Sequence, residues 1–243
     1  MTTDPALLDK TRHTGAGRCP VFWIPACAGR TAKAVRAIVR HPFTLSLLCS
    51  LLLFWANLAW AGAQRYEPLA ASVQAALHAA VSDQASPEPQ FDSIEEKIDW
   101  LAEMSRRLEK RMPDRRARHE FLRTVHYEAR RAGLDPQLVL GLIQVESGFR
   151  KHAVSSAGAR GYMQVMPFWV KVIGKPDHNL FHLRTNLRFG CTILRHYLDI
   201  EKGDLFRALG RYNGSLGRPE YPNLVRATWE KQWGWEPQRL AAR

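Results

Sequence analysis

Glu146 is the residue whose surroundings in this sequence best suit acid–base chemistry. It lies at the end of an apolar stretch, 138–145, which Asp135 and Pro136 precede as an N-cap and a first-turn proline. Gly148 then predicts the end of the helix. A carboxyl group there is buried and also faces the negative end of the helix dipole, so its pKa should rise. A carboxyl that stays protonated near neutral pH can act as a general acid.

The stretch after this helix has the composition of a sugar-binding loop. Gly158 and Gly161 allow sharp turns, and an aromatic ring, a thioether and an amide follow in Tyr162, Met163 and Gln164. This mixture suits a ligand that needs stacking and hydrogen bonds more than charge. No acidic residue occurs between Glu146 and Asp177, so a glycosidase with two carboxylates would need its second one from further away.

Three motifs in order resemble the soluble lytic transglycosylase domain, family 1. They are Glu146-Ser147 with Phe149, then Gly161-x-Met163-Gln164-x-Met166-Pro167, and then Tyr212-Asn213. Each motif alone would be weak, but the three together at these separations are specific. The resemblance covers roughly Phe121 to Trp235, about half of the chain.

The resemblance implies a mostly α, lysozyme-like helical domain that cleaves peptidoglycan. The substrate groove would lie between the catalytic helix and the segments 155–169 and 210–222. Glu146 would act alone, first as acid and then as base, on the β-1,4 bond between N-acetylmuramic acid and N-acetylglucosamine. The muramic acid 6-hydroxyl would attack its own anomeric carbon and leave a 1,6-anhydro end, and a nucleophile already held in place needs no second carboxylate.

The resemblance also implies roles for individual residues. Tyr212 resembles the residue that hydrogen-bonds the catalytic carboxyl, and Gly190 would allow close packing against the catalytic helix. Ser147 either orients Glu146 or a substrate group, or it caps the helix end. Arg211 replaces the family's common alanine, which leaves the local substrate contacts open. The substrate-binding residues expected in full are Ser147, Tyr162, Met163, Gln164, Tyr212 and Asn213.

We expect no cofactor and no catalytic metal, because the nine histidines form no HExxH-like pattern. The formal net charge of +12 is spread along the chain and favours an anionic partner. Peptidoglycan is the expected partner; the absence of zinc spacing or basic–aromatic repeats argues against nucleic acid. We expect a monomer, and leave open further partners in the cell wall or a secretion apparatus.

Two other functions remain open from the sequence. A goose-type, lysozyme-like muramidase would hydrolyse the same bond, with Asp177 or Glu128 as the carboxylate that activates water. A non-catalytic cell-wall-binding module would need no acid at all, although the Glu146 motif is intact.

The N-terminal third predicts export. Residues 1–34 read as a disordered or misassigned leader, and residues 35–61 as a signal peptide or membrane anchor. Basic residues precede an apolar run that ends in small residues at Ala59 and Ala61, which predicts cleavage near Ala61 and a periplasmic location. An uncleaved signal would instead anchor the chain in the inner membrane.

The rest of the chain divides into four expected parts. Residues 62–91 form a linker with room for a short helix around 70–80, and residues 92–114 form a charged helix with Ile94 and Ile98 among its inward residues. The catalytic domain spans 115–236, with helix starts at Asp114, Thr185 and Asp204, and 237–243 is a tail. Cys191 is expected to be a buried thiol.

Overall fold

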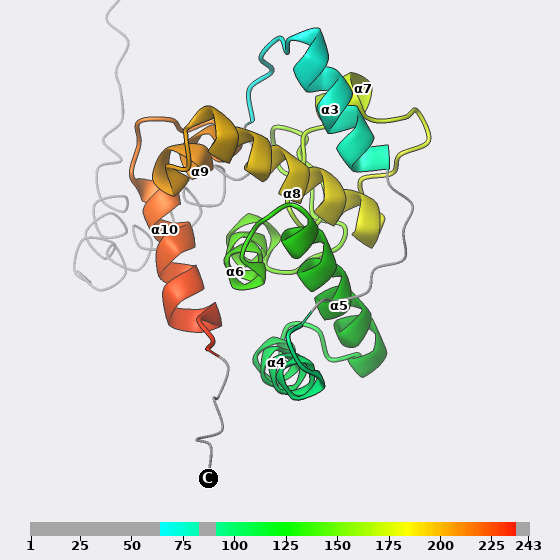
Figure 1. The fold of residues 1–243 in the computed structure, drawn as a ribbon, viewed down its shortest axis with the longest axis vertical. Coiled ribbons are helices and arrows are strands. Elements are labelled where there is room, and N and C mark those ends of the chain that lie inside the picture. The colour runs from blue at the N-terminus through cyan, green and yellow to red at the C-terminus, as the bar shows by residue number, and fades with distance from the viewer. Residues whose placement is uncertain (1–63, 83–90, 237–243) are drawn as a thin grey trace, which may run out of the picture. The chain divides into compact units, whose positions relative to one another are not determined.

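The computed structural model describes residues 64–82 and 91–236. The predicted leader (1–34), the signal peptide or anchor (35–61) and the tail (237–243) lie outside the described residues. Within them the fold is mostly α, as predicted (Figure 1). Their only β pairing is two isolated bridges, from Arg160 to Val154 and to Val165.

The described elements follow one another as helices joined by short loops. In order they are α3 (Ala71–Ser82), α4 (Ile94–Leu108), α5 (Arg115–Arg131), α6 (Pro136–Ser147), α7 (Phe168–Ile173), α8 (Leu183–Ile200), α9 (Leu205–Asn213), α10 (Glu220–Thr228) and a π-helical turn, η2 (Trp229–Trp233).

Helix α6 is the central element of the core. Helices α5 and α10 and the turn η2 pack against it, and Figure 1 shows it nearly end-on between α5 and α10. Its run from Leu138 to Ile143 is buried throughout. Gly141 allows the close approach of η2, because an added Cβ would lie 2.9 Å from the Trp229 Cα. A helix enclosed on so many sides needs apolar residues around most of its circumference, as its sequence provides.

Most of the predicted helix boundaries are confirmed. The Asp135 side chain accepts from Gln137 N, and Gly148 ends α6 in the left-handed conformation at φ 58°. Asp114 and Asp204 cap α5 and α9. The predicted start at Thr185 is wrong, because α8 begins two residues earlier, at Leu183, after an N-cap residue whose side chain makes no capping bond.

Helix α4 buries a face that includes Leu108, as its helical spacing predicts, but leaves out the two isoleucines expected beside it. Ile94 and Ile98 are 60% and 59% exposed, whereas Trp100, Met104 and Leu108 are buried. The buried residues recur every four positions, so they form a stripe that packs on α5. The large Trp100 ring, absent from the predicted inward set, selects this stripe, and the isoleucines are left outside it.

Helix α3 lies within the segment predicted as a linker and confirms the short helix expected there. It packs on α7 and α8 (Figure 1). The Gln74 side chain donates to Val172 O at 2.7 Å, and Arg131 donates to Ala80 O at 2.8 Å. Over its described part this segment is therefore packed against the domain.

None of the helices in residues 64–82 and 91–236 combines the length and apolar character needed to cross a membrane.

Candidate active site

Glu146 lies in the last turn of α6 and is only 4% exposed. Its Oε1 accepts a hydrogen bond from the Tyr221 hydroxyl. Its Oε2 is buried and has no hydrogen-bond partner among the described residues. Burial raises the pKa of this carboxyl to about 8, and the Tyr221 bond opposes the rise. The group therefore has the protonation state that a general acid requires near neutral pH.

The tyrosine bonded to this carboxyl is not the one that the resemblance implied. Tyr212, expected in that role, instead donates to Met163 O at 2.8 Å. Tyr221 lies in the first turn of α10, and α10 packs along α6, which brings its hydroxyl to Glu146. The contact crosses 75 positions of sequence, and the only sequence signal for it is a tyrosine in a half-apolar segment.

Met163 and Gln164, predicted as substrate contacts, are engaged inside the protein. Met163 is fully buried, and its backbone N–H donates to Asn186 Oδ1 at 2.8 Å. Gln164 has a positive φ of 49°, and its side chain donates to two carbonyls of its own loop, Ala153 O and Gly161 O. Both residues thus fix the shape of the loop, and their contact with substrate stays a prediction.

Ser147 and Asn213 make local bonds. Ser147 Oγ donates to Ile143 O at 3.2 Å, one turn back along α6, so of its two expected roles the structure favours the one at the helix end. Asn213 Nδ2 donates to Ser215 Oγ at 3.1 Å, and its Oδ1 is buried without a partner among the described residues. Both residues adjoin a glycine in the left-handed conformation, where their α-helices end.

Two further expectations concern packing. Tyr162 is buried, with its ring 4.9 Å from that of Phe121, near the end of α6 that carries Glu146. Gly190 was expected to admit the catalytic helix, but its nearest neighbour is Met163, whose Sδ would lie 2.3 Å from an added Cβ. The expectation about Gly190 is therefore wrong: at this position α8 packs against Met163 and supports the loop that carries it.

The two carboxylates named for a hydrolytic mechanism, Glu128 and Asp177, have surroundings different from those of Glu146. Glu128 is fully buried on α5 and paired with Arg188 at 2.8 Å and Arg131 at 2.9 Å. Arg184 lies 3.8 Å from the same carboxylate. Asp177 lies exposed in the loop between α7 and α8. Glu128 is committed to its ion pairs, and a carboxylate so committed is poorly placed to activate water.

The segment before α3 contacts the loop that follows the active site. Gln64 is 4% exposed, and its Oε1 accepts from Trp169 Nε1 at 3.0 Å and from Met166 N at 3.4 Å. Glu67 pairs with Arg211 at 3.2 Å. Residues 64–67 therefore join the end of the predicted substrate loop to the end of α9.

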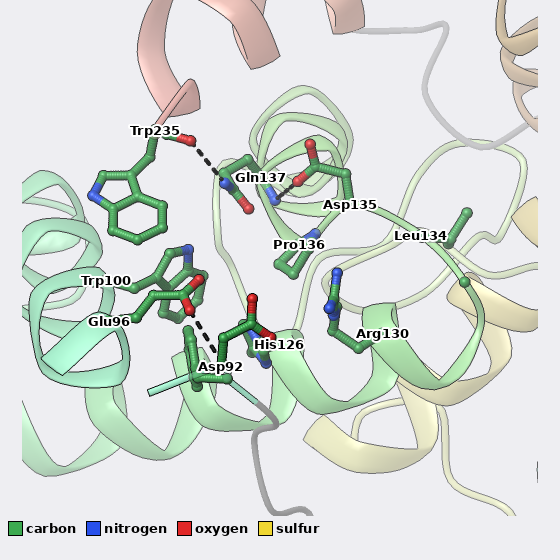
Figure 2. A pocket seen from close by; sticks show the side chains of 12 residues that line it. Asp92, Glu96, Trp100, His126, Arg130, Leu134, Asp135, Pro136, Gln137 and Trp235 are labelled. Carbon is green, nitrogen blue, oxygen red and sulfur yellow. Dashed lines mark hydrogen bonds between the residues drawn. The ribbon is translucent and has the colours of Figure 1, made fainter. Parts of the chain in front are cut away.

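A separate cavity lies at the opposite end of α6 (Figure 2). It measures about 640 Å³ and is lined by both aromatic and acidic side chains, among them Trp100, Trp235, Glu96 and Asp135. Gln137 in its wall is nine residues from Glu146, or roughly 14 Å along the helix axis. The cavity is thus distinct from the Glu146 site.

Residues 123–227 match the family model of the transglycosylase SLT domain. The resemblance predicted from the sequence is confirmed. All the predicted site residues, from Glu146 to Asn213, fall inside the matched range.

Several known proteins are similar in sequence to part of this chain. A transglycosylase of Enterobacteria phage PRD1 is 32% identical over 102 residues, which are 42% of this chain and 37% of the phage protein. The membrane-bound lytic murein transglycosylase C of Actinobacillus pleuropneumoniae serotype 5b is 50% identical over 48 residues, 20% of this chain and 13% of that protein. Its counterpart from Mannheimia succiniciproducens is 48% identical over the same length. The chain thus spans well under half the length of these relatives.

Proposed function

We propose that this protein is a peptidoglycan lytic transglycosylase with Glu146 as its catalytic acid and base. The observation that carries the proposal is the buried Glu146 carboxyl, with its pKa near 8, one oxygen bonded to Tyr221 and the other without a partner among the described residues. This carboxyl lies within the SLT domain match, and the similar proteins are named as transglycosylases.

The reaction would use the same carboxyl twice. Protonated Glu146 gives its proton to the oxygen that bridges N-acetylmuramic acid and N-acetylglucosamine, and the glycosidic bond breaks. The resulting carboxylate then takes the proton of the muramic acid 6-hydroxyl as that oxygen bonds to the anomeric carbon. The product is a 1,6-anhydromuramic end, and no water is consumed. A raised pKa suits the first step, and the Tyr221 hydroxyl stabilises the carboxylate formed between the two steps.

The hydrolytic alternative has less support. An enzyme of that kind needs a second carboxylate to activate water. Glu128 is fully buried and is paired with Arg131 and Arg188, so its carboxylate is poorly placed to activate water. A non-catalytic wall-binding module has no need for a buried carboxyl with a raised pKa, which is costly to keep inside a protein.

The proposed setting is the cell envelope, in the periplasm, with peptidoglycan strands as the substrate. The names of the relatives, which include a membrane-bound murein transglycosylase, support this setting. The chain's charge of +12 suits the carboxylates of the wall peptides.

The deciding experiment is digestion of purified peptidoglycan by wild type and by Glu146→Gln, with mass spectrometry of the products. Wild type should release muramic ends lighter by one water than a hydrolase leaves. The glutamine variant should lose activity about a hundredfold to ten-thousandfold, because general acid–base catalysis is typically worth that much. Reducing muramic ends would identify a lysozyme instead, and full activity in the variant would exclude Glu146 from the mechanism.

A further inference from the structure

A small cavity beside the end of α9 gathers positive charge. It measures about 260 Å³, and its wall includes the arginines Arg65, Arg211 and Arg218 and the acid Glu67. Arg211 is ion-paired with Glu67 and with Glu201, so the surplus positive charge comes from Arg65 and Arg218. Tyr197 and Ser215, both largely buried, also line it. Burial raises the pKa of Tyr197 well above its usual value, so its hydroxyl remains a hydrogen-bond donor at any physiological pH. The cavity is therefore lined by donors and cations.

Two parts of the chain build this cavity. Arg65 and Glu67 come from the segment before α3, outside the SLT domain match, whereas Arg211, Ser215 and Arg218 lie inside it. Arg211 joins the two parts through its ion pairs with Glu67 and with Glu201. An alanine at position 211, as is common in the family, could not hold the N-terminal segment in this way. The replacement by arginine thus has a structural consequence, namely this cavity.

The cavity adjoins the segment that carries Tyr212 and Tyr221. Arg211 directly precedes Tyr212, and Arg218 is three residues before Tyr221, whose hydroxyl bonds Glu146. The Arg218 and Tyr221 Cα atoms are therefore at most about 11 Å apart. A four-residue peptide spans up to about 14 Å when extended, which exceeds this Cα–Cα separation.

We propose that this cavity, formed by Arg65, Arg211, Arg218 and Tyr197, binds a carboxylate of the peptide attached to the muramic acid of the substrate. This inference rests on the proposed function, since it names a second part of the same substrate. Guanidinium groups match a carboxylate in charge and geometry. The volume suits the end of a single amino-acid residue and is small for a sugar pair. The site would make the enzyme prefer glycan that still carries its peptides.

The first test measures peptide binding directly and needs no catalysis. The free wall tetrapeptide, with its carboxylates intact, is titrated by calorimetry into Glu146→Gln protein. Arg65→Gln and Arg218→Gln should each weaken binding about threefold to tenfold, a modest loss because both side chains are exposed and partly screened by solvent. Tyr197→Phe should weaken it less. Arg226→Gln, which removes an exposed arginine of α10 outside the cavity, is the matched control and should have no effect.

Titration of inorganic phosphate in the same way shows whether the cavity prefers a phosphate or a peptide carboxylate. Tighter binding of phosphate than of the peptide, with the same dependence on Arg65 and Arg218, would overturn the proposal in favour of a phosphate site. Peptide binding that all the arginine variants retain unchanged would also overturn it.

The second test compares two substrates, soluble glycan strands with peptides and the same strands after an amidase has removed them. The Arg65→Gln/Arg218→Gln double variant should raise KM on the peptide-bearing strands by about tenfold and leave kcat unaltered. An equal rise in KM on the bare strands would assign these arginines to glycan binding instead and overturn the proposal. If wild type cleaves neither substrate, the proposed function fails, while the calorimetric test still decides the carboxylate site.

Discussion

Two buried glutamates on neighbouring helices have opposite surroundings. Glu128 on α5 is fully buried, and Arg131 and Arg188 bind its carboxylate, with Arg184 close by. Glu146 on α6 is 4% exposed, and its one hydrogen-bond partner within residues 64–82 and 91–236 is the hydroxyl of Tyr221. Burial is nearly the same for the two side chains, so they differ in the groups that contact their carboxyls.

The comparison separates a structural acid from a candidate catalytic one. A buried carboxylate with several guanidinium partners ties α5 to α8 through its ion pairs. A buried carboxyl with one neutral partner and one unbonded oxygen can exchange its proton, because neither form is strongly favoured near neutral pH. Sequence alone presents both as glutamates on apolar-faced helices.

The largest effect on stability is expected from Glu128→Gln. This change removes the charge that the buried Arg188 guanidinium pairs with, and breaking a buried ion pair from one side typically costs about 3–5 kcal/mol. Urea denaturation of the variant against wild type measures the loss. Asp199→Asn, which removes the acid of an exposed pair with Arg195, is the control and should change stability by less than about 0.5 kcal/mol. Equal losses in the two variants would contradict the assignment of Glu128 as an internal tie.

Glu146→Gln should have the opposite effect, and pH should control its size. The folded-state pKa of Glu146, about 8, exceeds its unfolded value, so wild type loses stability as pH rises from about 4.5 towards 8. The amide of the variant does not ionise. At pH 7 the free energy of unfolding of the variant should therefore exceed that of wild type by up to about 3 kcal/mol. Denaturation curves at pH 4.5, 6 and 7.5 measure this gap in unfolding free energy between the variant and wild type. A gap that stays constant with pH would mean that Glu146 is ionised in the folded protein.

The smallest effect is expected from the pair Tyr221→Phe and Tyr212→Phe. Loss of the Tyr221 bond removes an influence that lowers the Glu146 pKa, so the alkaline limb of the activity profile should move up by less than about one pH unit. Tyr212→Phe removes a bond to the Met163 carbonyl and should leave that limb in place. The pH profile of peptidoglycan cleavage by the three proteins tests this, and a shift in the Tyr212 variant alone would restore the role that the resemblance implied.

The sequence by itself determined helix α6 and the candidate catalytic residue at its end. Asp135, Pro136 and Gly148 are local signals, and each acts on backbone groups within a few positions, so they specify α6 without reference to the rest of the chain. The apolar run between them indicated burial, and burial is the main cause of the raised pKa of Glu146. Cys191 was likewise found as a buried free thiol, as its helical apolar setting predicted.

Only the tertiary structure decided which groups meet these residues. Tyr221 reaches Glu146 because α10 packs along α6, and arginines from α8 reach Glu128 because α8 packs on α5. Gln64 is buried although it lies in a segment with the composition of a linker. Its side-chain oxygen accepts the hydrogen bond that the buried Trp169 indole N–H needs. Such contacts join residues 60 to 105 positions apart, and helical periodicity carries information over only a few turns. Local sequence patterns therefore predicted most helix ends and buried faces, but they could not predict which side chains would be in contact across the fold.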